Sequence, residues 1–213
     1  RNTMKKAILL AITIIGWTTI AVRLYLRITE YDFSPFESTV QFFSYFTILT
    51  NLFVTLYCTN QLLKPDEKNT SILNRTETLS ALTVFILIVG LIYHIALKPI
   101  WNPEGMQMIL SEIHHTFIPL GALMLWFISD TKKTIKLKSL LKWILYPIIY
   151  ISFVLIRGSF SNFYPYPFLD VQSLGIEKVL MNSLLLLIIM VLFLIGFYFI
   201  GKKISKKTVA NIV

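Results

Sequence analysis

Residues 179–201 read VLMNSLLLLIIMVLFLIGFYFIG, and this run decides the fold class. Before Gly196, its only polar interruptions are Asn182 and Ser183. A bilayer core about 30 Å thick needs roughly 20 consecutive apolar residues in a helix, so the run is long enough to cross it. It therefore predicts a transmembrane helix near the C-terminal end of the chain.

The whole chain has the composition of a membrane protein. Of its 213 residues, 55% are hydrophobic and 15% are charged, whereas soluble domains average about 25% charged residues. This excludes a soluble domain. The formal charge of +9 does not indicate a nucleic-acid partner, because the Lys and Arg residues stand in short clusters between apolar runs. The one cysteine, Cys58, rules out an intramolecular disulfide.

Five further segments meet the same length criterion. We expect transmembrane helices at residues 6–27, 40–63, 79–99, 106–129, 140–156 and 179–201. The first is too long for a cleavable signal peptide, and no small-residue cleavage site follows it. No repeat or linker divides the chain. The sequence thus predicts an all-α integral membrane protein, a six-helix transmembrane bundle that forms a single domain over residues 1–213.

The distribution of Lys and Arg predicts the orientation of this bundle. Fifteen of them fall on the side that holds both termini and the loops after the second and fourth helices, and five fall on the other side. Positive residues concentrate on the cytoplasmic side, so both termini are predicted to be cytoplasmic. The Lys- and Ile-rich composition indicates a bacterial protein, hence the bacterial plasma membrane. Arg23 and Arg27, at the outer end of the first helix, are interpreted as interfacial anchors that extend toward the lipid headgroups.

Two polar stripes run along the second and fourth predicted helices. The first consists of Ser44, Thr47, Asn51 and Thr55, which step by helical spacing along one face. The second consists of Gln107, Ser111 and His114, with Met108, Glu112 and His115 beside it. Polar side chains that face lipid are costly, so both stripes should face the bundle interior. With about 1.5 Å of rise per residue, Thr47 and His114 lie at one depth, roughly 12 Å below the outer surface.

Other polar residues converge on the same outer half. His94 lies near the outer end of the third helix, and Arg157 closes the fifth. Arg157 is either a topology charge or an anion-binding group. The loop Tyr164-Pro-Tyr-Pro-Phe-Leu-Asp170 is either an interfacial aromatic belt or a wall of the site. The expected pocket residues are Ser44, His94, Ser111, Tyr164, Tyr166 and Asp170.

Three short motifs carry a family resemblance. They are Phe46-Thr47-Ile48-Leu49-Thr50-Asn51-Leu52, His114-His115-Thr116-Phe117-Ile118-Pro119, and Tyr166-Pro167-Phe168-Leu169-Asp170 followed by Gly175. Together they resemble the androgen-induced-gene family of multi-span membrane proteins, and more closely its bacterial relatives. The animal members of that family are threonine hydrolases that cleave fatty acid esters of hydroxy fatty acids.

The resemblance implies roles for particular residues. The family's nucleophile falls on Thr47, and its base falls on His114, five residues before Pro119. The family has an acidic residue three positions after its threonine, where this chain has Thr50 beside Asn51. The orienting partner of the base therefore stays open. The implied activity is the hydrolysis of fatty acid or other lipid esters in the outer half of the bilayer, without a cofactor.

The residues themselves allow the same chemistry. A threonine hydroxyl is a poor nucleophile and needs a base within about 2.6–3.2 Å, and a neutral imidazole such as that of His114 can serve near pH 7. Acyl transfer also needs oxyanion donors, for which Asn51, His115 and Arg157 are candidates, with Glu112 as a supporting group.

Two other functions stay open at this point. In one, His94, His114 or His115 would bind zinc together with Glu112 or Asp170, and metal-bound water would hydrolyse lipids. In the other, the outer cavity would bind a lipid, or a haem with His94 and a histidine of the fourth helix as axial ligands, without catalysis. The oligomeric state is left open.

Overall fold

The computed structural model describes residues 2–30, 32–64, 71–101 and 103–210, and every regular element in these ranges is helical. In chain order the α-helices are α1 (Asn2–Thr29), α2 (Pro35–Phe43), α3 (Phe46–Leu63), α4 (Thr78–Ile92), α5 (Gly105–Glu112), α6 (Ile118–Ile128), α7 (Leu137–Leu141), α8 (Leu145–Ser161), α9 (Val171–Leu174) and α10 (Ile176–Ala210). Two π-helical turns follow α4 and α5, at η2 (Tyr93–Leu97) and η3 (Ile113–Phe117). Short 3-10 turns occur at η1 (Ile72–Asn74), η4 (Thr131–Lys133), η5 (Lys142–Ile144) and η6 (Pro167–Leu169).

Five helical stretches of this part of the chain are long and apolar enough to cross a membrane, and a bent pair of helices makes a sixth. The five are Asn2–Thr29, Thr78–Leu97, Gly105–Ile128, Leu137–Ser161 and Ile176–Ser205. The membrane-spanning class predicted from the sequence is therefore supported. One predicted span is wrong in form: residues 40–63 are not one continuous helix, because α2 and α3 meet at 77°.

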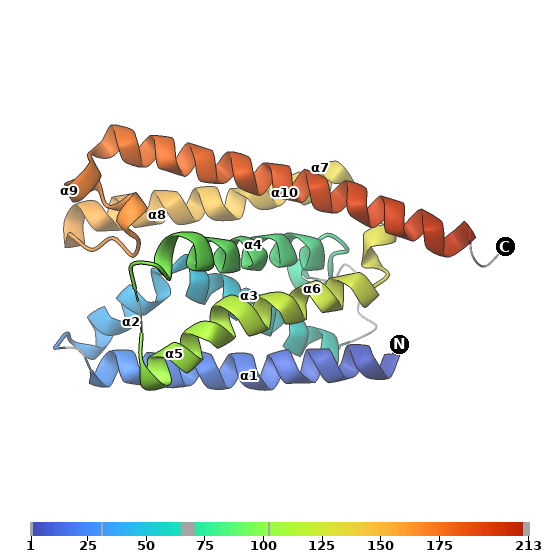
Figure 1. Cartoon of the computed structure of the whole chain (residues 1–213), viewed down its shortest axis with the longest axis horizontal. Coiled ribbons are helices and arrows are strands. Elements are labelled where there is room, and N and C mark those ends of the chain that lie inside the picture. The colour runs from blue at the N-terminus through green and yellow to red at the C-terminus, as the bar shows by residue number, and fades with distance from the viewer. Residues whose placement is uncertain (1, 31, 65–70, 102, 211–213) are drawn as a thin grey trace.

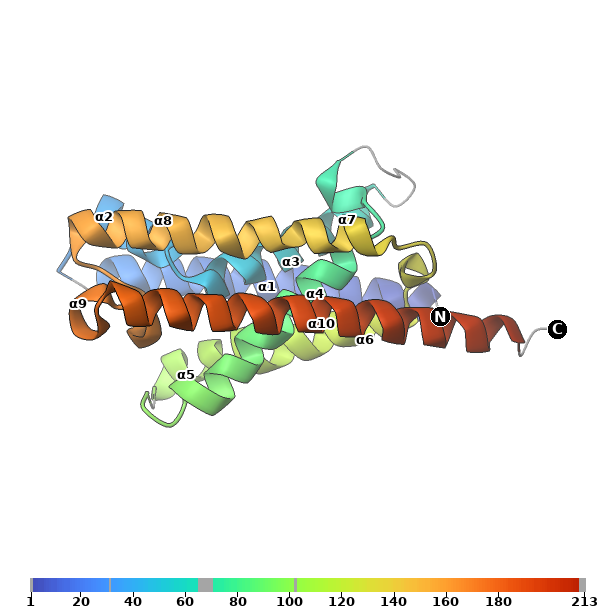
Figure 2. The same cartoon turned by 90° about the horizontal axis from the view of Figure 1, so that it is seen from above.

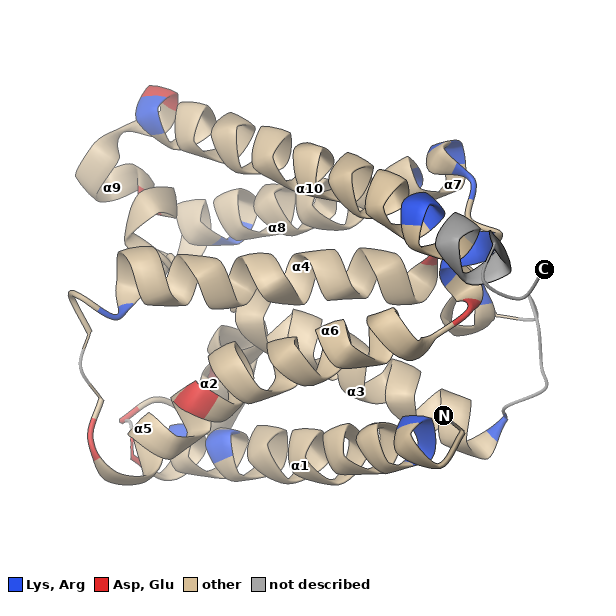
Figure 3. Ribbon diagram, turned by 45° about the vertical axis from the view of Figure 1, so that its right-hand side comes forward, with Lys and Arg blue, Asp and Glu red and all other residues tan. Residues whose placement is uncertain are grey.

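The spanning helices run side by side along the long axis of the molecule (Figures 1 and 2), and both termini lie at the same end of this bundle. The break between α2 and α3 lies toward the opposite end (Figure 1). Charged residues gather toward the helix ends and leave the middle of the bundle uncharged (Figure 3). This is the distribution that a hydrocarbon core about 30 Å thick imposes on a spanning protein.

Helix α4 is the centre of the bundle, because most of its side chains are buried on all sides. It packs against α3, α6 and α10. By contrast, α8 and α10 expose large apolar side chains, such as Ile149 (66% exposed) and Met181 (71%). Exposed aliphatic surface along the full length of two helices is compatible with contact to lipid rather than to water.

Gly90 sets the approach of α4 to the turn η3. A Cβ atom built on Gly90 would lie 2.6 Å from the backbone carbonyl oxygen of His115, so no side chain fits there. Pro119 has no N–H, so it cannot donate to the His115 carbonyl one turn earlier. That carbonyl is therefore left to lie against Gly90. The close packing of small residues is a usual way for helices to approach in membrane proteins.

We expect Gly90→Ala to destabilise the protein by about 1–3 kcal/mol, because a methyl group must push η3 away from α4. Thermal unfolding in detergent measures the effect. Gly196→Ala is the matched control, since a Cβ at Gly196 meets nothing within 4 Å. An equal or higher midpoint for Gly90→Ala than for Gly196→Ala would contradict the assigned contact.

Candidate functional site

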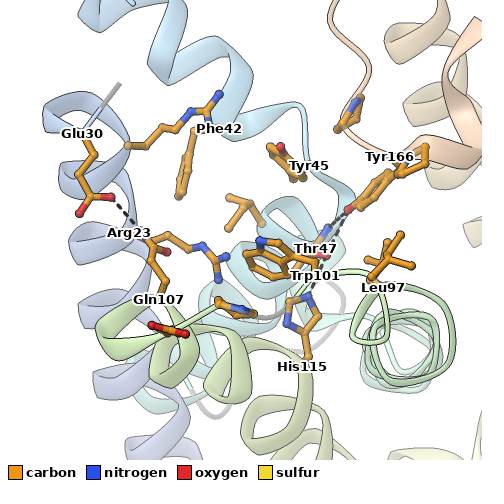
Figure 4. Close-up of a pocket in the computed structure, with 17 residues that line it drawn as sticks. Arg23, Glu30, Phe42, Tyr45, Thr47, Leu97, Trp101, Gln107, His115 and Tyr166 are labelled. Atoms are coloured by element: carbon orange, nitrogen blue, oxygen red, sulfur yellow. Dashed lines mark hydrogen bonds between the residues drawn. The ribbon is translucent and has the colours of Figure 1, made fainter. Parts of the chain in front are cut away.

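A cavity of about 600 Å³ lies toward the end of the bundle that is away from the two termini (Figure 1), and Figure 4 shows the residues that line it. Its walls come from the C-terminal part of α1, the break between α2 and α3, the connection between η2 and α5, the turn η3, and the loop between α8 and η6. Three polar groups meet on one side of it, and they belong to Thr47, His115 and Tyr166 (Figure 4).

The break between α2 and α3 creates the position of Thr47. Because α3 starts afresh at Phe46, the first backbone amides of this helix have no carbonyl partner one turn earlier. Two phenols take their place: Phe46 N–H donates to Tyr150 Oη (3.2 Å), and Thr47 N–H donates to Tyr166 Oη (3.1 Å). Tyr150 also donates to the carbonyl of Ser44 on the other side of the break (2.9 Å). The two tyrosines thus hold Thr47 at the first turn of α3.

Tyr166 also contacts the side chain of Thr47. Its Oη lies 3.1 Å from Thr47 Oγ1. Burial raises the pKa of Tyr166 to about 12, so the phenol keeps its proton and is able to donate it to Thr47 Oγ1. The threonine hydroxyl then keeps its own proton available for another acceptor.

That acceptor is His115, which is buried in the turn η3. Its Nε2 lies 3.5 Å from Thr47 Oγ1, and its Nδ1 lies 2.8 Å from the carbonyl oxygen of Ser111. A carbonyl only accepts, so Nδ1 carries the proton and Nε2 presents a lone pair to Thr47. The imidazole also stacks on the ring of Tyr93 at 4.0 Å, which fixes its plane.

These contacts form one directed chain of hydrogen bonds. Tyr166 O–H donates to Thr47 Oγ1, Thr47 O–H donates to His115 Nε2, and His115 Nδ1–H donates to the Ser111 carbonyl. A hydroxyl beside the unprotonated nitrogen of an oriented imidazole is the arrangement of an activated nucleophile. The separation of 3.5 Å is within the range of a resting site, where such bonds are often long.

His114 faces a different environment. Its Nδ1 lies 3.4 Å from the Arg23 guanidinium, and its Nε2 lies 3.0 Å from Thr19 Oγ1. A guanidinium only donates, so Nδ1 of His114 is the acceptor and Nε2 carries the proton. The imidazole beside Thr47 therefore belongs to His115, while His114, the predicted base, contacts Arg23 and Thr19.

Both histidines lie in a π-helical turn. In η3, the N–H of Ile118 bonds to the carbonyl of Ile113, five residues earlier, so the turn holds one residue more than an α-helical turn. Ser111 and His114 share one face, as their spacing predicts, because both contact Arg23. That face is turned toward α1, and the next residue, His115, meets Thr47.

Asn51 and Arg157 do not supply oxyanion donors to this cavity. The Asn51 amide donates to the carbonyls of Thr47 (2.8 Å) and His114 (3.3 Å), and ties α3 to η3. Arg157 is paired with Glu37 at 2.5 Å, which joins α8 to α2. Neither side chain lines the cavity. The predicted oxyanion role of both residues is therefore not supported by their positions.

Glu112 and His94 belong to a separate, solvent-facing cluster. Glu112 accepts from Lys98 (2.6 Å) and from Thr116 (2.8 Å), and His94 Nε2 lies 3.0 Å from Thr116 Oγ1. This cluster links η2 to η3 on the outside of the bundle. It does not reach the cavity beside Thr47.

The other predicted pocket residues have structural contacts instead. Ser44 Oγ donates to the Val40 carbonyl, and Ser111 Oγ donates to the Gln107 carbonyl. Tyr164 packs where a side chain on Gly158 would otherwise lie. Asp170 caps the short helix α9 through the amides of Gln172 and Ser173. Of the six predicted pocket residues, only Tyr166 lines the cavity.

Several lining residues were not predicted for this site. They are Arg23, Arg27, Glu30, Tyr45, Trp101 and Gln107. Arg23 also contacts Ser111 Oγ (3.4 Å) and lies over the Trp101 ring at 5.9 Å from its centroid. Arg27 follows Arg23 by four positions, which places both on one face of α1. That spacing could have predicted the arrangement, because two arginines on one face of α1 indicate a face turned toward the bundle interior better than two separate interfacial anchors.

Within the described ranges, no group of three or more His, Cys, Asp or Glu side chains has an arrangement that could hold a metal ion. The geometry of the described residues therefore does not support the zinc alternative. Comparison with known proteins adds no further information: no family model, no curated protein and no solved structure matches the chain.

The two adjacent histidines should be neutral tautomers of opposite kind. We expect the Nδ1–H form for His115 and the Nε2–H form for His114, because a carbonyl faces one Nδ1 and a guanidinium faces the other. Nitrogen NMR of the protein labelled in its three histidines measures this directly. His114→Gln and His115→Gln assign the signals. The same tautomer at both positions would contradict the hydrogen-bond assignment.

Proposed function

We propose that the protein is an intramembrane hydrolase of lipid esters, with Thr47 as the nucleophile and His115 as the general base. The observation that carries this proposal is the directed chain from Tyr166 through Thr47 to His115 and the Ser111 carbonyl. The carbonyl of Ser111 orients the imidazole, as a carboxylate does in other hydrolases. The resemblance to membrane threonine hydrolases supports the same activity and the same nucleophile, Thr47, but it puts the base at His114 rather than at His115.

The reaction follows from the positions of these groups. Thr47 Oγ1 attacks the carbonyl carbon of the ester, and its proton passes to His115 Nε2. As Thr47 Oγ1 gives its electron pair to the new bond, the single proton of the Tyr166 hydroxyl would turn from Thr47 Oγ1 to the oxyanion, which the positive N-terminal end of α3 would also stabilise. The tetrahedral intermediate then expels the alkoxide, which takes the proton from His115. An acyl-threonine remains.

Water completes the cycle by the same route. His115 takes a proton from a water molecule, the hydroxide attacks the acyl carbon, and the Thr47 oxygen leaves with that proton. The products are a carboxylic acid and an alcohol, and the enzyme returns to its starting state. Both half-reactions use only groups that already line or contact the cavity.

The surroundings favour an amphipathic substrate. Arg23 and Arg27, together with Glu30 and Glu104, give the cavity charged groups of both signs, while Phe42, Tyr45 and Trp101 give it aromatic surface. The charge distribution of the sequence supports cytoplasmic termini, which would place the cavity toward the outer leaflet. An ester whose acyl chains stay in that leaflet would reach Thr47 without leaving the membrane. A lipid-binding protein without hydrolysis is the second candidate, since the same cavity would hold the ligand.

We expect Thr47→Ala and His115→Ala to lower ester hydrolysis by about 10²–10⁴-fold, because each removes a reacting group. Hydrolysis of a chromogenic acyl ester and of a branched fatty acid ester by the purified protein in detergent measures this loss. Thr47→Ser should keep substantial activity, because it keeps the hydroxyl. His114→Gln is the matched control, and we expect its loss to be less than about tenfold.

Each other result has a definite meaning. Loss in His114→Gln with activity retained in His115→Ala would reverse the assignment of the base. Fluorophosphonate labelling that disappears in Thr47→Ala identifies the nucleophile independently of the substrate. If the protein elutes as a folded species in size-exclusion chromatography and binds a fatty acid ester without hydrolysing it, the binding function is favoured instead.

The orientation is tested separately. We expect a green fluorescent protein fused after Val213 to fluoresce and alkaline phosphatase fused at the same place to be inactive, because the C-terminus is proposed to be cytoplasmic. Phosphatase inserted after Gly175, on the cavity side of the bundle, should be active. The reverse pattern would place Thr47 in the inner leaflet.

A further inference from the structure

A second hollow lies on the far side of Thr47 from the cavity. It is a narrow crevice of about 40 Å³ between α4, α8 and α10. Five of the residues that line it have open-chain aliphatic or thioether side chains and come from these three helices: Val89, Ile92, Ile151, Leu186 and Met190. The crevice and the cavity meet at Thr47, Leu97 and Tyr166, which line both. The reactive hydroxyl therefore stands at the boundary between two compartments.

The two compartments differ in chemistry. The cavity carries the guanidinium groups of Arg23 and Arg27 and the carboxylate of Glu30. The crevice has no charged side chain, and the polar groups on its wall are hydroxyls already bonded to backbone or to each other, such as Tyr150 Oη to Phe46 N–H. An apolar chain gains free energy on entering such a crevice, whereas a charged headgroup would lose its hydration without compensation.

The dimensions limit what the crevice admits. Its volume is a few times the roughly 10–15 Å³ that a single water molecule needs. It thus has room for a short length of unbranched hydrocarbon and not for an aromatic ring. It is not sealed, and the helices α8 and α10 beside it expose apolar side chains such as Ile149 and Leu185. A longer chain would continue from the crevice along that apolar surface.

We propose that the α4–α8–α10 crevice is the acyl subsite, which takes the first carbons of an unbranched fatty acyl chain, while the alcohol part of the ester lies in the cavity. This proposal rests on the proposed hydrolase function. It makes Met190 and Leu186 the residues that select the acyl chain, because both lie on the side of α10 that lines the crevice. The substrate class is then an ester of a linear fatty acid with a more polar alcohol.

The test is an acyl-length series of p-nitrophenyl esters, from acetate to decanoate, with pivalate as the branched member. Wild-type protein should prefer the linear chains of intermediate length and hydrolyse pivalate poorly. In Met190→Trp, whose larger side chain fills the crevice, we expect kcat/KM for octanoate to fall at least tenfold and that for acetate to change less than twofold. Met190→Ala should do the opposite and raise pivalate hydrolysis.

The controls separate this proposal from the hydrolase proposal. Leu10→Trp makes the same change at an exposed position of α1, a helix that does not line the crevice, and should leave the acyl-length profile unchanged. If Met190→Trp does not fold, Leu186→Phe and Met190→Ala test the same wall from opposite directions. An unchanged profile in active variants would overturn the acyl subsite while leaving the hydrolase intact. An inactive wild-type protein on every ester would overturn the hydrolase, and the subsite with it.

Discussion

The arrangement of the site depends on one constraint: backbone amides inside a bundle that excludes water must find hydrogen-bond partners. The 77° bend between α2 and α3 leaves the first amides of α3 without carbonyls. Tyr150 and Tyr166 supply the missing partners from α8 and from the loop before η6. The same phenol that satisfies Thr47 N–H also contacts Thr47 Oγ1. Repair of the broken helix and orientation of the hydroxyl are therefore one interaction.

A second irregularity matches the first. The turn η3 has π-helical geometry, and Gly90 allows the His115 carbonyl to lie against α4. The two histidines of this turn then face opposite ways: His114 toward Arg23 and Thr19, and His115 toward Thr47. Asn51 donates to carbonyls on both sides, Thr47 and His114, and so fixes the distance between α3 and η3. Two departures from regular helix geometry thus meet at one point, as π-helical turns often do at functional sites.

Hydropathy and charge in the sequence predict the parts of this structure that depend on long-range averages. Most of the helical spans and the inward direction of Thr47 follow from composition and spacing, whereas Tyr166 was expected at the site from the family resemblance and from its place in an aromatic loop that had two interpretations. The choice between His114 and His115 does not, because two adjacent residues point about 100° apart on a helix and only the packing of η3 against α1 and α3 decides which one meets Thr47. The bend at Ser44 and Tyr45 is hidden for the same reason: the residues on both sides are apolar, and the stabilising phenols lie about 100 positions later. Arg23 and Arg27 are predicted at the interface because a charged side chain near a helix end can point either toward the lipid headgroups or into the bundle. Only the packing of α1 against η3 selects the inward direction.

The position of Thr47 also determines in which units the substrate concentration should be expressed. Thr47 is 7% exposed and lies toward one end of a bundle whose outer faces on α8 and α10 are apolar. An ester that reaches it as proposed arrives by lateral diffusion in two dimensions, so the relevant quantity is its mole fraction in the bilayer or micelle rather than its molarity in water. Added detergent would then act as a diluent, and the apparent KM would rise in proportion to the detergent present. For such a protein, rates are comparable between preparations only at a fixed ratio of substrate to amphiphile.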